Sequence, residues 1–138
     1  MAPIVEVSAA LIRDADGRYL ITQRRQGSHL AGRWEFPGGK VEAGETPEAC
    51  MRRELMEELS ATFAVGELVD TIRWDYPERT VILYFFACRL EAGEIAPREQ
   101  QAMKWVEPAR LTDHDFPPAD RELIERLRRE GVSGRARP

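Results

Sequence analysis

The stretch GKVEAGETPEACMRRELMEELSA occupies residues 39–61 and carries the strongest structural signal in the sequence. Thr46 is a residue type that caps a helix by accepting a backbone hydrogen bond, and Pro47 suits the first helical turn, where its missing N–H costs nothing. Apolar side chains then recur at every fourth residue and form one face, at Met51, Leu55 and Leu59. This pattern predicts a helix over residues 46–60.

Three glutamates, Glu54, Glu57 and Glu58, stand at positions i, i+3 and i+4 of this helix. Helical periodicity places them within about 100° of arc on one face. On a solvated helix such like charges repel by roughly 0.2–0.5 kcal/mol per pair, and a divalent cation would reverse the sign of that interaction. Carboxylate oxygens are ligands that Mg²⁺ prefers. For the three glutamates taken alone, a solvated acidic face is the alternative interpretation.

Two neighbouring features favour a ligand site over a solvated face. The glutamates lie in the C-terminal half of the predicted helix, where the helix dipole disfavours negative charge. The segment Phe36-Pro37-Gly38-Gly39 comes before the helix, and its adjacent glycines let the backbone approach an ion or a phosphate closely.

Strand patterns flank the helix on both sides. Runs of apolar residues bounded by turn residues predict strands at Val5–Ile12, Tyr19–Gln23, Trp34–Phe36, Leu68–Trp74, Thr80–Leu90 and Met103–Val106. A last helix is predicted at about Ala119–Glu130. We expect one domain over residues 1–130 and a mobile tail over residues 131–138, where glycine, arginine and proline gather. Strands interrupted by a long helix indicate an α/β protein with a mixed sheet.

The composition disfavours several classes of partner. The chain has 138 residues and a formal net charge of −4, which argues against binding to polymeric nucleic acid. A small polyphosphate ligand stays compatible, because a bound metal can supply positive charge. No run approaches the roughly 18 to 20 apolar residues of a membrane span, so no membrane partner is expected. Cys50 and Cys88 lack metal-ligand spacing and are interpreted as buried thiols in a reducing, cytoplasmic compartment.

Residues 39–61 resemble the Nudix box, the signature of the Nudix hydrolases. The signature is G, five residues, E, seven residues and then REUXEEXGU, where U is a bulky aliphatic residue, and this chain keeps those spacings. Its fixed positions are matched by Gly39, Glu45, Arg53, Glu54, Leu55, Glu57 and Glu58. Ser60 replaces the glycine and Ala61 the last aliphatic residue. We therefore expect a slightly altered helix exit, because serine accepts a left-handed conformation less readily than glycine, with metal binding retained.

The resemblance extends beyond the box. Trp34–Lys40 (WEFPGGK) and Asp115–Asp120 (DFPPAD) are similar to segments of the MutT-like enzymes and of the related CTP pyrophosphohydrolases. Together the similar segments span roughly residues 4–130. The resemblance implies the Nudix fold, which is an α/β/α sandwich around a mixed β-sheet.

For the box itself, the resemblance implies a divalent metal site. The implied ligands are the side chains of Glu54, Glu57 and Glu58 and the Gly39 carbonyl, with Mg²⁺ as the cofactor and Mn²⁺ as its substitute. Glu99 matches an additional metal-binding or catalytic glutamate of MutT-like enzymes, and a surface loop charge is its alternative role. Arg53 is implied to orient a catalytic glutamate, and a solvated partner of Glu57 is the alternative. A glutamate of the box, Glu54 or Glu57, or a carboxylate outside the helix would take a proton from the attacking water.

Four residues are candidates for substrate binding. Asp120 aligns with a base-recognising asparagine of MutT-like enzymes. As an ionised acceptor it would take two hydrogen bonds from a guanine-type edge or one from the cytosine amino group, and a charge at a helix N-terminus is its alternative role. Arg24 and Lys40 are candidates for pairing with phosphates, or else plain surface charges. Phe36 is a candidate for the base slot, or else packs in the core.

The resemblance implies a Mg²⁺-dependent nucleoside triphosphate pyrophosphohydrolase that releases a monophosphate and pyrophosphate. An oxidised purine nucleotide such as 8-oxo-dGTP is the first expectation for the substrate, and CTP or a modified dCTP is the second. A Nudix-fold module that binds nucleotides without cleaving them is the alternative of another class, which the intact glutamates disfavour. A nucleotide sugar or dinucleoside polyphosphate is a third possibility, weakened by the short chain. The sequence leaves open whether the protein is a monomer or a homodimer.

Overall fold

The structure is a computed structural model and describes residues 3–24, 32–98 and 101–133. The chain divides into two compact units, one built from residues 1–12 and 37–100 and the other from residues 13–36 and 101–138. The first unit therefore contains the whole of the helix predicted over residues 46–60, and the second contains the C-terminal helix.

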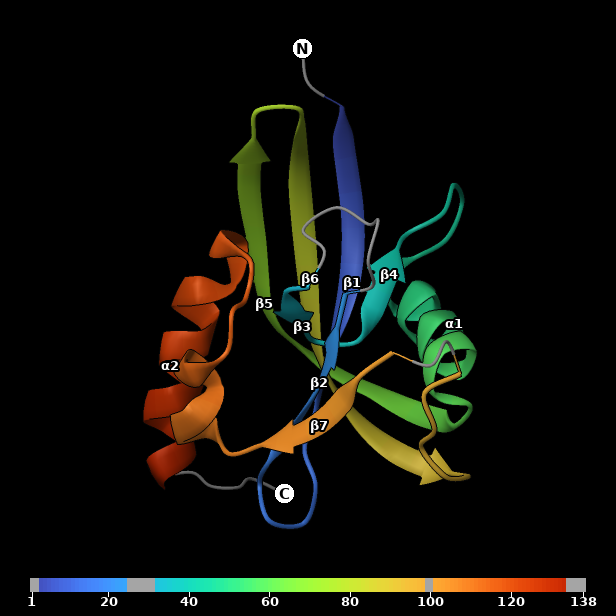
Figure 1. The fold of residues 1–138 in the computed structure, drawn as a ribbon. Coiled ribbons are helices and arrows are strands. Elements are labelled where there is room, and N and C mark those ends of the chain that lie inside the picture. Colours follow the sequence, from blue (N-terminus) through green and yellow to red (C-terminus); the bar gives the residue numbers. More distant parts are fainter. Residues whose placement is uncertain (1–2, 25–31, 99–100, 134–138) are drawn as a thin grey trace. The chain divides into compact units, whose positions relative to one another are not determined.

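The first unit is a four-stranded mixed sheet with a helix packed on it (Figure 1). Its strands are β1 (Ile4–Ile12), β4 (Gly38–Lys40), β5 (Thr62–Tyr76) and β6 (Arg79–Ala92). They lie in the order β4-β1-β6-β5, with β1 parallel to β6 and the other two pairs antiparallel. The predicted mixed sheet is confirmed. Both β5 and β6 are longer than predicted. In β5, register shifts between Val65 and Asp70 interrupt the alternation that marks a strand.

Helix α1 (Pro47–Leu59) begins and ends where the sequence indicated. The Thr46 side chain accepts a hydrogen bond from the backbone N–H of Ala49 at 3.1 Å, and Pro47 takes the first helical position. The buried face comprises Cys50, Met51, Leu55, Glu58 and Leu59. The apolar members of this face pack against the sheet, so the helix surface that carries the glutamates has a fixed orientation relative to β1 and β4.

Ser60 ends α1 in the left-handed conformation, with φ 61° and ψ 29°. Its backbone N–H donates to the Met56 carbonyl at 3.1 Å. The expected change in the helix exit is therefore not found, because Ser60 adopts the geometry that glycine adopts more easily. It is the only residue other than glycine with positive φ among the described residues.

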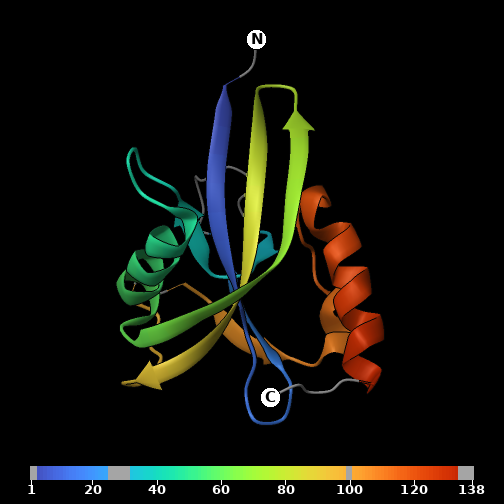
Figure 2. The ribbon, with the colours of Figure 1, turned by 180° about the vertical axis from the view of Figure 1, so that it is seen from behind.

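The second unit combines a three-stranded antiparallel sheet with the C-terminal helix (Figure 2). Its strands are β2 (Tyr19–Gln23), β3 (Trp34–Glu35) and β7 (Met103–Val106), in the order β3-β2-β7. Two short 3₁₀ segments, η1 (Pro108–Asp113) and η2 (Pro118–Asp120), precede α2 (Arg121–Ser133), which packs on η1.

Helix α2 corrects the prediction at both of its ends. It starts at Arg121 and not at Ala119, because η2 occupies the residues before it. It continues to Ser133, so three residues of the predicted tail are helical, and residues 134–138 lie outside the described residues. Within the described ranges, no helix has the length and apolar character needed to cross a membrane.

Replacing Ser60 by glycine should stabilise the protein. Glycine has no Cβ to strain the left-handed backbone, so Ser60→Gly should raise the free energy of unfolding by about 0.5–1 kcal/mol in urea denaturation. Ser60→Ala is the matched control and should give no gain, because alanine keeps the Cβ. Equal stability of all three proteins would show that the cap is unstrained.

Candidate active site

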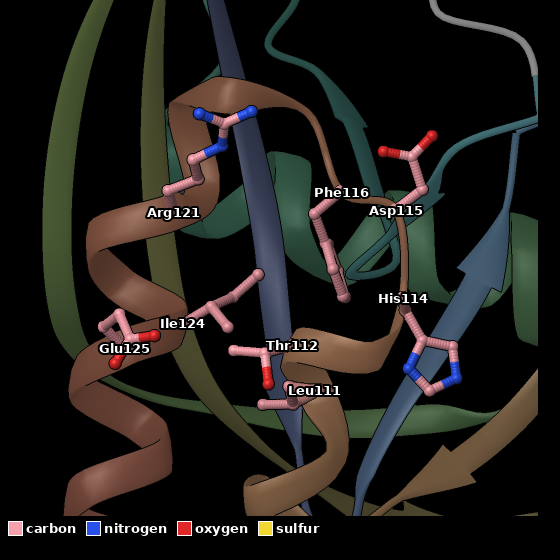
Figure 3. A pocket seen from close by; sticks show the side chains of 8 residues that line it. All are labelled: Leu111, Thr112, His114, Asp115, Phe116, Arg121, Ile124 and Glu125. Carbon is pink, nitrogen blue, oxygen red and sulfur yellow. The ribbon is translucent and has the colours of Figure 1, made fainter.

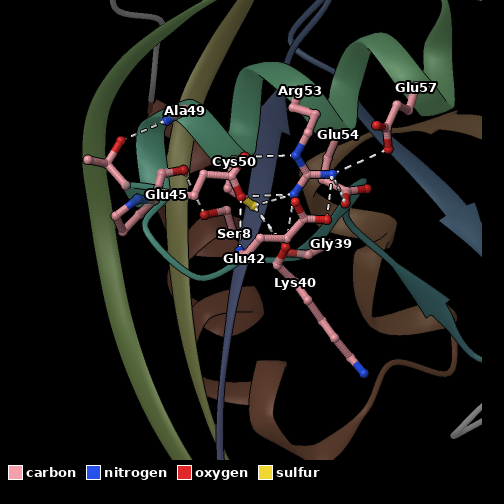
Figure 4. A network of polar contacts seen from close by, with 12 residues as sticks. Ser8, Gly39, Lys40, Glu42, Glu45, Ala49, Cys50, Arg53, Glu54 and Glu57 are labelled. Carbon is pink, nitrogen blue, oxygen red and sulfur yellow. Dashed lines mark hydrogen bonds and ion pairs between the residues drawn. The ribbon is translucent and has the colours of Figure 1, made fainter.

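Arg53 connects the predicted catalytic helix to the loop before it (Figure 4). Its Nε and Nη2 atoms donate to the two carboxylate oxygens of Glu45 at 2.7 and 2.9 Å. Its Nη1 atom donates to Glu54 at 2.8 Å and to Glu57 at 3.3 Å. Nη2 also donates to the Lys40 carbonyl at 3.1 Å. One guanidinium thus joins β4, the loop after it and two of the predicted metal ligands.

The ion pair with Arg53 strongly favours the charged form of Glu45. The hydrogen bonds from Arg53 are the main reason that the pKa of Glu45 falls to about 2, and Glu45 in turn raises the pKa of Arg53. Glu45 also accepts a hydrogen bond from the backbone N–H of Glu42 at 3.0 Å. Its carboxylate therefore supports the loop and holds Arg53 in place.

Glu54 lies directly against the backbone of Gly39. A Cβ atom at Gly39 would overlap the carboxyl group of Glu54, so only glycine leaves room for this contact. Burial raises the pKa of Glu54, although Arg53 acts in the opposite direction. Glu54 also shares a hydrogen bond with Glu58. Glu58 is 9% exposed, whereas the side chain of Glu57 is 57% exposed, so the predicted ligands lie at different depths.

The two adjacent glycines let β4 approach its neighbours closely. Gly38 pairs with Ala9 and Gly39 pairs with Ser8, and a Cβ atom at Gly38 would collide with the Ser8 carbonyl. On the helix side, the thiol of Cys50 lies 3.5 Å from the Gly39 carbonyl oxygen and 3.4 Å from that of Lys40. These contacts fix the backbone whose carbonyl is a predicted metal ligand.

The donor atoms around Glu54 suit a hard divalent cation. Carboxylate and carbonyl oxygens are what Mg²⁺ and similar ions bind. The missing side chain at Gly39 lets the Glu54 carboxyl group lie against the backbone that carries the Gly39 carbonyl. In the described part of the chain, no three acidic, histidine or cysteine side chains already form a coordination set. Arg53 instead neutralises Glu54 and Glu57. Glu99, the predicted additional ligand, lies outside the described residues.

Asp120 has a different environment, in the second unit. It lies in η2 and is 6% exposed, and no hydrogen bond of its carboxyl group with a described residue is found. Burial, and then the charge of Glu35, raise the pKa of Asp120 to about 7. The prediction of an ionised, purely accepting aspartate is therefore incomplete. Burial thus favours the protonated form of the Asp120 carboxyl group, which can also donate a hydrogen bond.

The other predicted substrate residues are placed as follows. Arg24 forms an ion pair with Glu35 at 2.6 Å. Phe36 is 3% exposed and packs against Tyr19 and Phe116, with ring centroids 6.2 and 5.4 Å apart. Lys40 is exposed, and its side chain points away from the carboxylates in Figure 4. The structure thus brings Gly39, Arg53 and Glu54 together, whereas Arg24, Phe36 and Asp120 belong to the second unit.

An apolar face of the mixed sheet was not identified from the sequence. Residues that are directly paired across neighbouring strands share one face of the sheet. Across β1, β6 and β5, one paired row consists of Val5, Val81 and Trp74, and the next consists of Val7, Leu83 and Ile72. All six side chains keep part of their surface exposed, up to 39% for Trp74. The sequence predicted the strands β1 and β6, but only the register between the strands shows that these residues form one surface.

A cavity of about 330 Å³ lies in the second unit between α2 and the segment before it (Figure 3). It is lined by Leu111, Thr112, His114, Asp115, Phe116, Arg121, Ile124 and Glu125. None of the predicted site residues is among the residues that line this cavity.

The geometry and the box residues define a class of protein: the chain belongs to the Nudix family, whose NUDIX domain model matches residues 3–127. Enzymes of this family hydrolyse nucleotide substrates and generally need a divalent metal. A MutT protein from Methanosarcina mazei has a crystal structure that superposes with a TM-score of 0.81 at 29% identity, covering 94% of this chain and 96% of that one. This likeness confirms the predicted Nudix fold.

Two relatives have named activities. An 8-oxo-dGTP diphosphatase of Haemophilus influenzae is 41% identical over 127 residues, which cover 92% of this chain and 93% of the relative. A CTP pyrophosphohydrolase of Escherichia coli K12 is 37% identical over 122 residues, which cover 88% and 90%. The predicted resemblance to both branches of the family is therefore confirmed.

Burial of Asp120 should make stability depend on pH in a defined window. The folded-state pKa is raised to about 7, so folding favours the protonated form. This contribution is complete below pH about 4 and is lost as the pH rises through about 7. The free energy of unfolding of Asp120→Asn, measured by urea denaturation, should therefore rise relative to that of the native protein as the pH increases between these limits. The gain should be on the order of 1–4 kcal/mol. Asp113→Asn, which changes an exposed aspartate, is the control. The assignment would be contradicted if the difference in free energy of unfolding from the native protein did not vary with pH for either variant.

Proposed function

We propose that this Nudix hydrolase is a Mg²⁺-dependent nucleoside triphosphate pyrophosphohydrolase that acts on oxidised purine nucleotides, with 8-oxo-dGTP as its first substrate and Mn²⁺ as a substitute metal. The products are a nucleoside monophosphate and pyrophosphate. The observation that carries the proposal is the contact of Glu54 with the Gly39 backbone, which is held by Arg53. The 41% sequence identity with an 8-oxo-dGTP diphosphatase supports the choice of substrate.

The box residues have separate roles in this proposal. Glu54, Glu57, Glu58, Glu99 and the Gly39 carbonyl would hold the metal. When bound, the metal polarises phosphoryl oxygens and makes bound water more acidic. Arg53 keeps Glu54 and Glu57 in place, since it donates to both carboxylates. Like charges crowded on one helix face need such a counter-charge before a cation arrives.

The attacking water also needs a proton acceptor. Glu54, Glu57 and Glu99 are the candidates. Glu57 is the most accessible of the box glutamates, and its contact with Arg53 at 3.3 Å is longer than that of Glu54 at 2.8 Å. Glu57 can therefore turn toward solvent at little cost, which suits a group that exchanges protons with water.

Substrate recognition is proposed for residues of each unit. In the first unit, Lys40 has an exposed ammonium group that suits phosphates, and the face of Val5, Val7, Val81 and Leu83 offers an apolar surface that suits a base ring. In the second unit, Asp120 has a buried carboxyl group to which no described residue forms a hydrogen bond, and this group would hydrogen-bond to the base edge. Phe36 supports this region through its packing, and Arg24 must loosen its ion pair with Glu35 to reach a phosphate.

A CTP or modified dCTP pyrophosphohydrolase is the second candidate. The relative with CTP pyrophosphohydrolase activity supports it, and the Asp120 carboxyl group can accept a hydrogen bond from a cytosine amino group. A non-catalytic nucleotide-binding module is disfavoured because every glutamate of the box is present. We place the protein in the cytoplasm, in keeping with two buried free cysteines. Its net charge of −4 disfavours polymeric nucleic acid as a partner.

A hydrolysis panel tests the substrate. We expect the highest kcat/KM for 8-oxo-dGTP, with dGTP, CTP and 5-methyl-dCTP each lower by about tenfold or more, because one well-placed hydrogen-bond pair is worth about 1–3 kcal/mol. Release of pyrophosphate, and not of inorganic phosphate, should accompany each monophosphate. A maximum for a cytosine nucleotide would assign the protein to the second candidate, and binding without any release would support the non-catalytic module.

A further inference from the structure

We propose that Cys50 is a positioning residue for the metal: its buried thiol donates to the backbone of β4 and holds the Gly39 carbonyl in the direction that a divalent cation needs. The inference rests on the proposed metal site, in which the Gly39 carbonyl is a ligand. It goes beyond that site because the Nudix box leaves the residues between Glu45 and Arg53 free, so the box gives this thiol no role. Cys50 touches no metal or substrate atom in this proposal.

The first support is the direction of the thiol. Its Sγ atom lies 3.5 Å from the Gly39 carbonyl oxygen and 3.4 Å from the Lys40 carbonyl oxygen, so the S–H group is shared between two successive carbonyls (Figure 4). Cys50 is 0% exposed, so solvent does not reach the thiol. A thiol is a weak donor, but here no water competes for its hydrogen.

The second support is the division of the two carbonyls between two donors. The Lys40 carbonyl also accepts a hydrogen bond from Nη2 of Arg53 at 3.1 Å. At the Gly39 carbonyl, the side-chain donor found among the described residues is the thiol of Cys50. Arg53 thus tethers the residue that follows the proposed ligand, and Cys50 tethers the ligand itself.

The third support is the lack of a side chain at residue 39. A Cβ atom there would overlap the carboxyl group of Glu54, so the close contact of Glu54 with β4 requires glycine. Glycine is also the residue that restricts the backbone least, and Gly38 stands next to it. A hydrogen bond to the Gly39 carbonyl limits the rotation of this peptide group. The residue that lets Glu54 approach therefore leaves the direction of its own carbonyl to an outside donor.

The position of Cys50 on α1 links this donor to the carboxylate ligand. Cys50 and Glu54 stand at i and i+4, so they are neighbours on one face of the helix. Because the thiol and the carboxylate belong to one rigid element, the Gly39 carbonyl is held in a constant position relative to Glu54. A cation that binds both oxygens then meets a preformed pair.

Binding of Mn²⁺ in the absence of nucleotide, measured by electron paramagnetic resonance, tests the inference. Cys50→Ala removes the donor and should bind Mn²⁺ about threefold to tenfold more weakly, a small loss for a group that orients a metal ligand because a thiol is a weak donor. Cys50→Ser keeps a donor and should bind within about twofold of the native affinity. A role limited to packing predicts the reverse order, because a buried hydroxyl group is more costly than a methyl group.

Cys88 provides a matched control. It is the other buried cysteine of the same unit, and its thiol lies 3.6 Å from the Phe86 carbonyl oxygen of β6. Cys88→Ala should leave the Mn²⁺ affinity unchanged. In this variant the S–H stretching band in the infrared spectrum belongs to Cys50 alone, since the chain has two cysteines. Saturating Mg²⁺ should shift this band to higher frequency, because a cation on the Gly39 carbonyl weakens the hydrogen bond that it accepts.

The outcomes separate the inference from the metal site on which it rests. The inference alone is overturned if Cys50→Ala binds Mn²⁺ as the native protein does while Glu54→Gln binds more weakly. It is also overturned if Cys50→Ala and Cys50→Ser lose affinity equally, or if Mg²⁺ leaves the S–H band of Cys88→Ala in place. Equal affinity in the native protein, Cys50→Ala and Glu54→Gln would overturn the metal site and the inference with it. The infrared measurement holds even where a Cys50 variant fails to fold, because it uses the native thiol.

Discussion

The ion pairs of Arg53 are the interaction on which the candidate site depends. One guanidinium binds Glu45, Glu54 and Glu57 and also donates to the carbonyl of Lys40. Without this counter-charge the glutamates of α1 would repel one another, and the segment that carries Gly39 would lose a tether to the helix. The same residue therefore neutralises the carboxylates of Glu54 and Glu57 and holds them in position.

The arrangement of α1 could be predicted because its signals are local. Thr46 and Pro47 fix the start of the helix, and the apolar repeat fixes its buried face. The bond from Arg53 to Glu45 could not be predicted from helical periodicity, since Glu45 precedes the helix and reaches Arg53 through the fold of the loop. Likewise, β4 has two glycines and no apolar pattern. It forms a strand because its backbone pairs with that of β1.

Burial is the property that the sequence described least well. Glu54, Glu57 and Glu58 are equivalent by spacing, yet Glu58 is buried and Glu57 is mostly exposed. Asp120 was expected to be an ionised acceptor, and its pKa of about 7 comes from burial and from Glu35, which lies far away in the sequence. The apolar face of the mixed sheet depends in the same way on strand register, which only the folded chain defines.

The most direct test of the account is the binding of Mn²⁺ to the purified protein, measured by electron paramagnetic resonance in the absence of nucleotide. The native protein and Glu48→Gln, which changes an exposed glutamate in the first turn of the same helix, should bind with equal affinity. Glu54→Gln should bind at least about tenfold more weakly, because it replaces a carboxylate ligand by a neutral amide. Equal affinity in all three proteins would contradict the account, because the metal would then lie elsewhere.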